Sequence, residues 1–323
     1  MLEIGFSVST GHRNRPDYKG VLMKKLALRS AFAFSVFLTA FNASALVAGQ
    51  DPSVDSQASI KQNYYGAKFY NSVLGQARDE KLKLELKTIL KSAHVQNADG
   101  PDQLVPTCES QKNCVTQTSI GYDGARKFIF GKFYLVKVDS SNYGIKEMYC
   151  DRIYQGADFK SGSAPGPGVV PDNAIINVEH TWPQSKFSGK YPKELQKADM
   201  HHLYPTDSQM NSIRGNHIFG EVEKDGQHVK CSASRFGHGS AGGAQIFEPP
   251  IRHKGHVARA LFYFSVRYDM AISPAEESVL KAWHAQYPVD AEEVTRNEEI
   301  YKFQKNRNPF IDHPELGTAI SDF

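Results

Sequence analysis

The chain has 323 residues, of which 40% are hydrophobic and 23% are charged, so it can bury a full-sized core. It carries 38 lysines and arginines against 35 acidic residues, but its first 45 positions hold six of the basic and two of the acidic ones. Without that segment 32 basic residues face 33 acidic ones, which argues against a purely electrostatic nucleic-acid binder and requires any polyanion to bind a local basic patch.

The N-terminal segment has the pattern of an export signal. Residues 23–45, MKKLALRSAFAFSVFLTAFNASA, begin with basic side chains, continue as an apolar run and close on an Ala-x-Ala cleavage pattern. The alternative is a membrane anchor, but the apolar run is shorter than the roughly 20 residues that span a bilayer. We expect residues 1–22 to be an upstream extension without function, residues 23–45 to be a signal peptide, and residues 46–323 to form one mature domain. Export predicts a periplasmic or secreted protein, which we expect to be monomeric and free of the membrane.

The next part of the chain contains a helix and then strand-like residues. Residues 81–93, KLKLELKTILKSA, place apolar side chains at helical spacing and predict an amphipathic helix. Residues 125–150 are expected to finish a helix and then to alternate from Phe133 through Val138, before turn-forming residues at 139–142. This is the one short β segment that the alternation predicts.

Four cysteines follow the export signal: Cys108, Cys114, Cys150 and Cys231. An even number in an exported chain predicts two disulfides. Three pairings are possible, and Cys108–Cys114 with Cys150–Cys231 is the simplest. Because no Cys-x-x-Cys occurs, a zinc ribbon or a thioredoxin-like redox motif is disfavoured.

The C-terminal third is predicted to be helical. Residues 254–270, 273–288 and 290–306 have helical periodicity, with a capping box at 273–276 and Asp290 as the N-cap of the last of these helices. Helices around a short β segment give the α+β class.

Residues 177–222 depart from ordinary globular composition, because they gather four histidines with asparagines, acids and an arginine. Zinc is one explanation, with His180, His201 or His202 and Asp199 as ligands. His201 and His202 are adjacent, however, and on a strand they would point to opposite faces. The cysteines do not fit such a site.

A hard metal matches the stretch better. Magnesium takes oxygen ligands and needs only one or two from the protein, which Glu179 and the amide oxygen of Asn211 could supply. His180 would then be free to act as a general base. Arg214 follows Asn211 by three residues and is the nearest candidate for a cation that neutralises transition-state charge. This set predicts phosphodiester hydrolysis.

At this point the sequence resembles a known family. The segments EHTWPQSKF, KADMHHLYPTDSQMNSIRGNHIFGEV, FEPP, HKGHVARALFYFSVRY and RNPFIDHPEL, with residues 125–150, look like the bacterial endonuclease I family. These are exported nonspecific nucleases of the His-Me finger, or ββα-metal, type. The resemblance runs from about residue 60 to 318.

The resemblance implies a role for each matching residue. His180 would activate water, and Glu179 and Asn211 would hold one Mg²⁺, for which Mn²⁺ or Ca²⁺ could substitute. His202 stands where related fingers often carry an asparagine, so we expect it to support the site. Arg214 and Asn216 occupy the RGN of the family pattern and are expected to contact phosphate.

Two basic residues near FEPP, Arg252 and Lys254, are further candidates for phosphate contact, although they could form only a solvated face. The predicted function is an exported nonspecific endonuclease that cleaves DNA and possibly RNA. Three alternatives stay open: a ribonuclease of the same family, a zinc-dependent hydrolase and a catalytically dead nucleic-acid-binding module. The sequence does not fix the preference between DNA and RNA, because such a finger contacts backbone and sugar.

Overall fold

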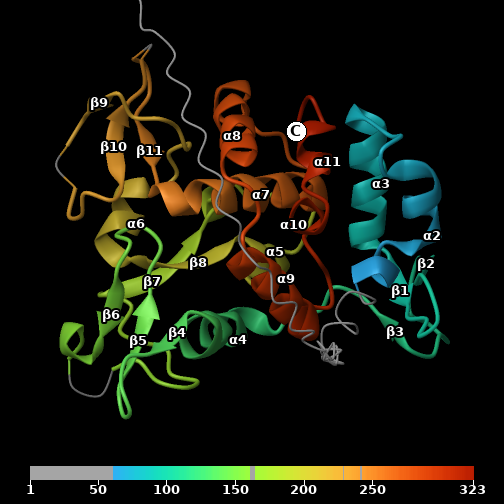
Figure 1. Ribbon diagram of the computed structural model, residues 1–323, viewed down its shortest axis with the longest axis horizontal. Helices are drawn as coiled ribbons and strands as arrows, with labels where there is room; N and C mark the ends of the chain where they lie inside the picture. Colours follow the sequence, from blue (N-terminus) through green and yellow to red (C-terminus); the bar gives the residue numbers. More distant parts are fainter. Residues whose placement is uncertain (1–60, 161–163, 228, 241) are drawn as a thin grey trace, which may run out of the picture. The chain divides into compact units, whose positions relative to one another are not determined.

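The computed structural model describes residues 61–160, 164–227, 229–240 and 242–323, which belong to one compact unit (Figure 1). The upstream extension and the signal peptide expected at 1–22 and 23–45 lie outside the described residues. Long helices surround four small antiparallel sheets, so the α+β class is confirmed. Within the described ranges, no helix combines the length and the apolar character that crossing a bilayer requires.

Five helices of eight residues or more form most of the helical part: α3 (Asp79–Lys91), α4 (Gly121–Phe128), α7 (Ile251–Tyr268), α8 (Pro274–Gln286) and α9 (Ala291–Gln304). The shorter helical segments are α2 (Gly66–Lys68), η1 (Phe69–Val73), η2 (Ile129–Phe133), η3 (Gly156–Asp158), η4 (Gln184–Lys186), α5 (Lys193–Lys197), η5 (Met200–His202), α6 (Ser208–Arg214), α10 (Pro309–Asp312) and α11 (Glu315–Thr318). The helices expected at 81–93, 254–270, 273–288 and 290–306 are therefore confirmed.

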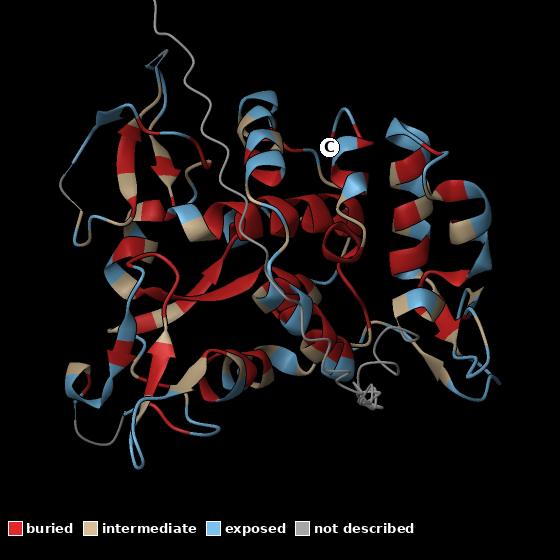
Figure 2. Cartoon of the chain, viewed as in Figure 1, coloured by how far each residue is buried: buried red, intermediate tan, exposed pale blue. Residues whose placement is uncertain are grey.

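Helix α7 is the centre of the packing. Every residue from His253 to Tyr268 is buried, and Figure 2 shows the helix buried along most of its length. Helices α3, α8 and α10 contact it, and the aromatic run at 262–264 lies in the core. A helix that is buried all round must also place its charged residues inside, where each needs a partner.

The strands are short and pair only with antiparallel neighbours. The three-stranded sheets have the orders β2-β1-β3, β4-β5-β6 and β11-β10-β9, and the fourth sheet is the pair β7-β8. Their bounds are β1 (Ala93–Val95), β2 (Gln103–Val105), β3 (Cys114–Val115), β4 (Leu135–Lys137), β5 (Tyr143–Lys146), β6 (Ile153–Gln155), β7 (Ile176–His180), β8 (Leu203–Asp207), β9 (Lys224–Asp225), β10 (Arg235–His238) and β11 (Ile246–Glu248). The expectation of a single β segment was wrong, because strands of two to five residues are too short to show alternation.

Two disulfides are present, and their pairing is the simplest of the three: Cys108–Cys114 and Cys150–Cys231. The second joins the segment after β5 to the segment before β10, across 81 residues.

One predicted cap is wrong. Ser273 precedes α8 but makes no side-chain cap hydrogen bond. The expected partner, Glu276, instead accepts a hydrogen bond from the backbone N–H of Phe219, so tertiary contact replaces the local capping box. The N-cap predicted at Asp290 is confirmed, since its side chain accepts from the backbone N–H of Glu293.

Candidate active site

The polar stretch at 177–222 folds around the pair β7–β8 and the short helix α6. Strand β7 ends at His180, which lies opposite Leu203, the first residue of β8. The side chain of Asp207, the last residue of β8, accepts from the backbone N–H of Met210 and so caps α6. Gly215 has a positive φ of 51° and ends α6 directly after Arg214. This arrangement brings Asn177 and Asn211, which are 34 positions apart in sequence, into contact.

Glu179 is buried in β7, and its hydrogen bonds within the described residues all fall on one carboxylate oxygen. Oε1 accepts from the hydroxyl of Tyr149 at 2.9 Å and from Nη1 of Arg214 at 2.5 Å. Among the described residues Oε2 has no hydrogen-bond partner. Burial raises the pKa of Glu179 to about 7, a rise that Arg214 and Tyr149 limit by stabilising the carboxylate.

Asn211 turns its amide toward the same strand. Its Nδ2 donates to Oδ1 of Asn177 at 2.7 Å and to the carbonyl of Val178 at 3.2 Å. Asn177 and Glu179 are two residues apart on β7, so their side chains lie on one face of the strand. Because both hydrogens of the Asn211 amide are used, its Oδ1 remains as an acceptor.

These two oxygens fit a hard cation. A carboxylate and an amide oxygen without hydrogen-bond donors are the ligand types that Mg²⁺ takes from a protein, with water completing its coordination. The fit rests on Oε2 of Glu179 and Oδ1 of Asn211, for which the described part of the chain supplies no donor.

His180 is held as a neutral base. Its Nε2 lies 3.1 Å from the carbonyl of Lys197, which can only accept, so Nε2 carries the hydrogen and Nδ1 the lone pair. Nε2 of Gln184 lies 3.3 Å from Nδ1 and can donate to it. Burial lowers the pKa of His180 to about 3, with further lowering by His202 and nearby cations.

His202 lies behind His180. It is fully buried, its ring centroid is 5.4 Å from that of His180, and its Nε2 is 2.8 Å from the carbonyl of Gln196. A buried ring fixed to a backbone carbonyl and packed on Phe264 can hold His180 in place but cannot touch substrate. The supporting role remains a prediction, and this position agrees with it.

Arg214 is in a different setting from the one expected of it. It is buried, and besides Glu179 it donates to the carbonyls of His180 and Thr181 at 3.0 and 2.7 Å. Its charge is already balanced by Glu179. This placement does not support contact with phosphate, and makes Arg214 a positioning residue for Glu179 and for the turn after β7.

The three other predicted contacts differ in exposure. Asn216 is exposed just after α6. Arg252 is half-buried, pairs with Asp151 and donates to the carbonyl of Glu147 at 2.6 Å. Lys254 is buried, and its ammonium lies 2.7 Å from Glu221 and 2.8 Å from Glu248. The position of Lys254 therefore gives no support to the predicted phosphate contact.

Of the residues proposed as zinc ligands, Asp199 is fully occupied by other bonds. Asp199 accepts from Tyr263, Tyr268 and Gln117 through Oδ2, and from Gln304 and the backbone of His201 through Oδ1. His201 places its Nε2 3.3 Å from the carbonyl of Asn306. The predicted zinc site therefore loses its carboxylate ligand.

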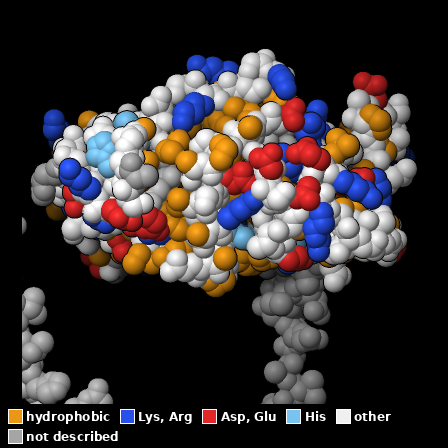
Figure 3. Space-filling view, turned by 90° about the horizontal axis from the view of Figure 1, so that it is seen from above, with side chains coloured by type: hydrophobic (Ala, Val, Ile, Leu, Met, Phe, Trp, Pro, Cys, Tyr) orange, Lys and Arg blue, Asp and Glu red, His pale blue; other side chains and the backbone are white. Residues whose placement is uncertain are grey.

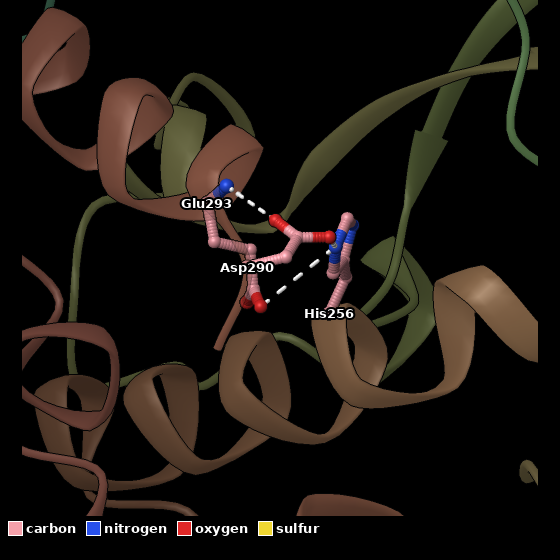
Figure 4. Close-up of side chains that lie close together, drawn as sticks. All are labelled: His256, Asp290 and Glu293. Atoms are coloured by element: carbon pink, nitrogen blue, oxygen red, sulfur yellow. Dashed lines mark hydrogen bonds and ion pairs between the residues drawn. The ribbon is translucent and has the colours of Figure 1, made fainter. Parts of the chain in front are cut away.

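A second group of a histidine and two carboxylates lies elsewhere, where His256, Asp290 and Glu293 approach one another (Figure 4). Asp290 caps α9 with Oδ1 and accepts from Nε2 of His256 with Oδ2 at 3.0 Å. Both oxygens of Glu293 accept from Arg259, at 2.7 and 2.5 Å. These contacts anchor α9 to α7 and leave little capacity for a cation.

Some site residues were not identified from the sequence. Asn177 could have been, because it is an asparagine two residues before Glu179 within the polar stretch at 177–222. Tyr149, Gln184 and the carbonyl of Lys197 could not, because only the fold brings them to Glu179 and His180.

Comparison with known proteins gives a family match. A model of the family described as Endonuclease I matches residues 79–315. An extracellular ribonuclease of Bacillus subtilis is 39% identical over 163 residues, which cover 45% of this chain and 53% of the relative. An extracellular deoxyribonuclease of Aeromonas hydrophila is 33% identical over 117 residues, 36% of this chain and 49% of the relative. The chain thus spans about half the length of the curated relatives it matches.

Proposed function

Because the chain belongs to the endonuclease I family, we propose that it is an exported endonuclease that hydrolyses phosphodiester bonds of nucleic acid with one Mg²⁺ ion and His180 as the general base. The unit formed by β7, β8 and α6 would be its His-Me finger. The observation that carries the proposal is the state of three atoms at the end of β7. Nδ1 of His180 holds a lone pair, and among the described residues Oε2 of Glu179 and Oδ1 of Asn211 have no hydrogen-bond donor.

Each residue of the proposed site would have its own role in the reaction. Nδ1 of His180 would take a proton from the attacking water, while the Lys197 carbonyl keeps the ring oriented. Glu179 and Asn211 would hold Mg²⁺, which when bound supplies positive charge to the scissile phosphate and the leaving oxygen. Gln184 donates to the same nitrogen, so its amide must give way to the water.

The named relatives differ in whether they act on DNA or RNA. Relatives at 39% and 38% identity are named extracellular ribonucleases, whereas the Aeromonas relatives are named deoxyribonucleases. The higher identity favours RNA as a substrate alongside DNA, and a ribonuclease is the second candidate function. The names of these relatives also support export, to the periplasm or beyond it, and we propose a monomer acting free of the membrane.

A cleavage assay tests the proposal. Plasmid DNA and a structured RNA are incubated with the protein at one salt concentration, with Mg²⁺, with Zn²⁺ or with EDTA. We expect cleavage with Mg²⁺ and none with EDTA. Cleavage supported by Zn²⁺ but not by Mg²⁺ would establish the zinc hydrolase instead, and binding without cleavage would establish the catalytically dead module.

A further inference from the structure

The side chain of Lys197 lies beside the proposed base. Lys197 ends α5, and the same residue that holds His180 through its carbonyl places its ammonium 4.6 Å from the ring centroid of Tyr122. Tyr122 comes from α4, and its ring centroid lies 5.5 Å from that of His180. Three separate elements therefore bring an ammonium, an aromatic ring and an imidazole into contact.

The charge of Lys197 is not balanced locally. Among the described residues no carboxylate lies within ion-pair distance of its ammonium. The other basic candidates are all paired: Arg214 with Glu179, Arg252 with Asp151, and Lys254 with Glu221 and Glu248. Basic and acidic side chains also lie beside one another on the face seen in Figure 3. Unlike those three residues, Lys197 has no acidic partner among the described residues, and the residue is half-buried.

Such a group is suited to a phosphate. An ammonium that has no acidic partner can neutralise a phosphate, and water screens that charge less where the side chain is half-buried than where it is fully exposed. An aromatic face next to the cation adds a surface on which a base or a sugar can pack. The placement beside His180 puts both features next to the bond that would be cut.

We propose that Lys197 and Tyr122 form a nucleotide subsite beside His180, in which the Lys197 ammonium neutralises a backbone phosphate and the Tyr122 ring contacts the adjoining nucleoside. The subsite rests on the proposed nuclease function and supplies the cation that was expected of Arg214. The competing explanation is that the Lys197 stem and ammonium only cover the Tyr122 ring, as long cationic side chains often do.

Binding without cleavage separates these explanations. A fluorescent single-stranded oligonucleotide is titrated in EDTA at several salt concentrations. We expect Lys197→Met to bind more weakly and to reduce the slope of log K against log salt by about 0.7, the value for one phosphate contact on a single strand. Lys197→Arg should keep the slope. Lys193→Met removes an exposed charge from the same helix and is the matched control, which should also keep it.

Kinetics with Mg²⁺ give the second measurement. Lys197→Met should lose ~10-fold or more in kcat/KM. The loss should stay below the ~10²–10³-fold in kcat that follows removal of one oxyanion-hole donor. Tyr122→Leu should raise KM, and Tyr122→Phe should not. Should Lys197→Met fail to fold by circular dichroism, Lys197→Gln tests the same charge.

The outcomes distinguish this inference from the proposed function. If Lys197→Met matches Lys193→Met in slope and in kcat/KM while His180→Ala is inactive, the subsite is wrong and the nuclease stands. If the wild-type protein binds the oligonucleotide with a slope that depends on Lys197 but never cleaves it, the subsite stands and the nuclease is wrong. If wild type neither binds nor cleaves, both are wrong.

Discussion

Two clusters in this protein contain the same kinds of residues and differ in what their atoms are left to do. Around the end of β7, Glu179 and Asn211 each keep one oxygen that has no donor among the described residues, and Nδ1 of His180 meets only the amide of Gln184. Between α7 and α9, Asp290 uses both carboxylate oxygens and Glu293 is closed by Arg259. Histidine and carboxylates therefore do not make a site by composition. A site also needs acceptor atoms that the fold holds in place and leaves available to a ligand.

The largest effect should come from removing the base. His180→Ala should lose ~10²–10⁴-fold in rate, because a positioned general base is gone, while nucleic-acid binding stays near wild type. His256→Ala, from the closed cluster, should keep its turnover per folded molecule. Cleavage kinetics with added imidazole or added Mg²⁺ decide the role. Rescue by imidazole supports a base, whereas rescue by metal alone would make His180 a ligand.

The closed cluster should respond in stability instead. Arg259→Met leaves the buried Glu293 carboxylate without its partner and should cost about 3–5 kcal/mol in the free energy of unfolding. The double variant Arg259→Met with Glu293→Leu should recover much of that loss. Urea denaturation measures both. A loss below 1 kcal/mol in the single variant would show that the pair is not isolated from water.

Removing one proposed ligand should change the metal dependence. Asn211→Ala should raise the Mg²⁺ concentration for half-maximal cleavage by at least the ~10–100-fold typical of residues that only support a metal ligand. Its maximal rate should also fall. Asp290→Asn should leave the Mg²⁺ dependence as in wild type. If Asn211→Ala does not change the dependence, the metal is held elsewhere.

The smallest effect is a pH dependence of stability. The hydrogen bond from His256 lowers the pKa of Asp290 to about 2, from a usual 3.8. A lowered pKa stabilises the folded state above the unfolded value, and the contribution is lost as pH falls from 3.8 toward 2. Asp290→Asn keeps the cap but not the charge. Its urea midpoint should lie below wild type at pH 6 and approach it near pH 2.5. An equal gap at both values would contradict the assignment.

The long helices could be predicted because their signal is local, whereas the number of cysteines predicts two disulfides but does not choose their pairing. Helical periodicity located α3, α7, α8 and α9, and four cysteines leave three pairings. The small sheets could not be predicted, since strands of two or three residues are defined by their partners. The cap at Ser273 failed for a related reason, because Glu276 bonds to Phe219, which no local pattern reveals.

The sequence indicates which residue types belong to the candidate site, and that assignment stays a prediction, but it does not predict which side chains contact one another. Glu179, His180 and Asn211 stand out because a carboxylate, an imidazole and an amide oxygen are the groups that metal-assisted hydrolysis requires. The burial of Arg214 depends on α6 packing against β7, and so it could not be read from the spacing of Asn211 and Arg214. The sequence does not mark Lys197 as a cation beside His180, because the two residues become neighbours only when α5 packs next to the end of β7.

The ion pair between Glu179 and Arg214 decides how an inactive form should be made for trapping a substrate complex. Replacing Glu179 would strand a guanidinium in the interior, so loss of cleavage would be mixed with loss of folded protein. Replacing His180 removes a neutral ring and leaves that pair intact. A crystallographer who wants an uncleaved nucleic-acid strand bound beside α4 and α5 should therefore begin with His180→Ala.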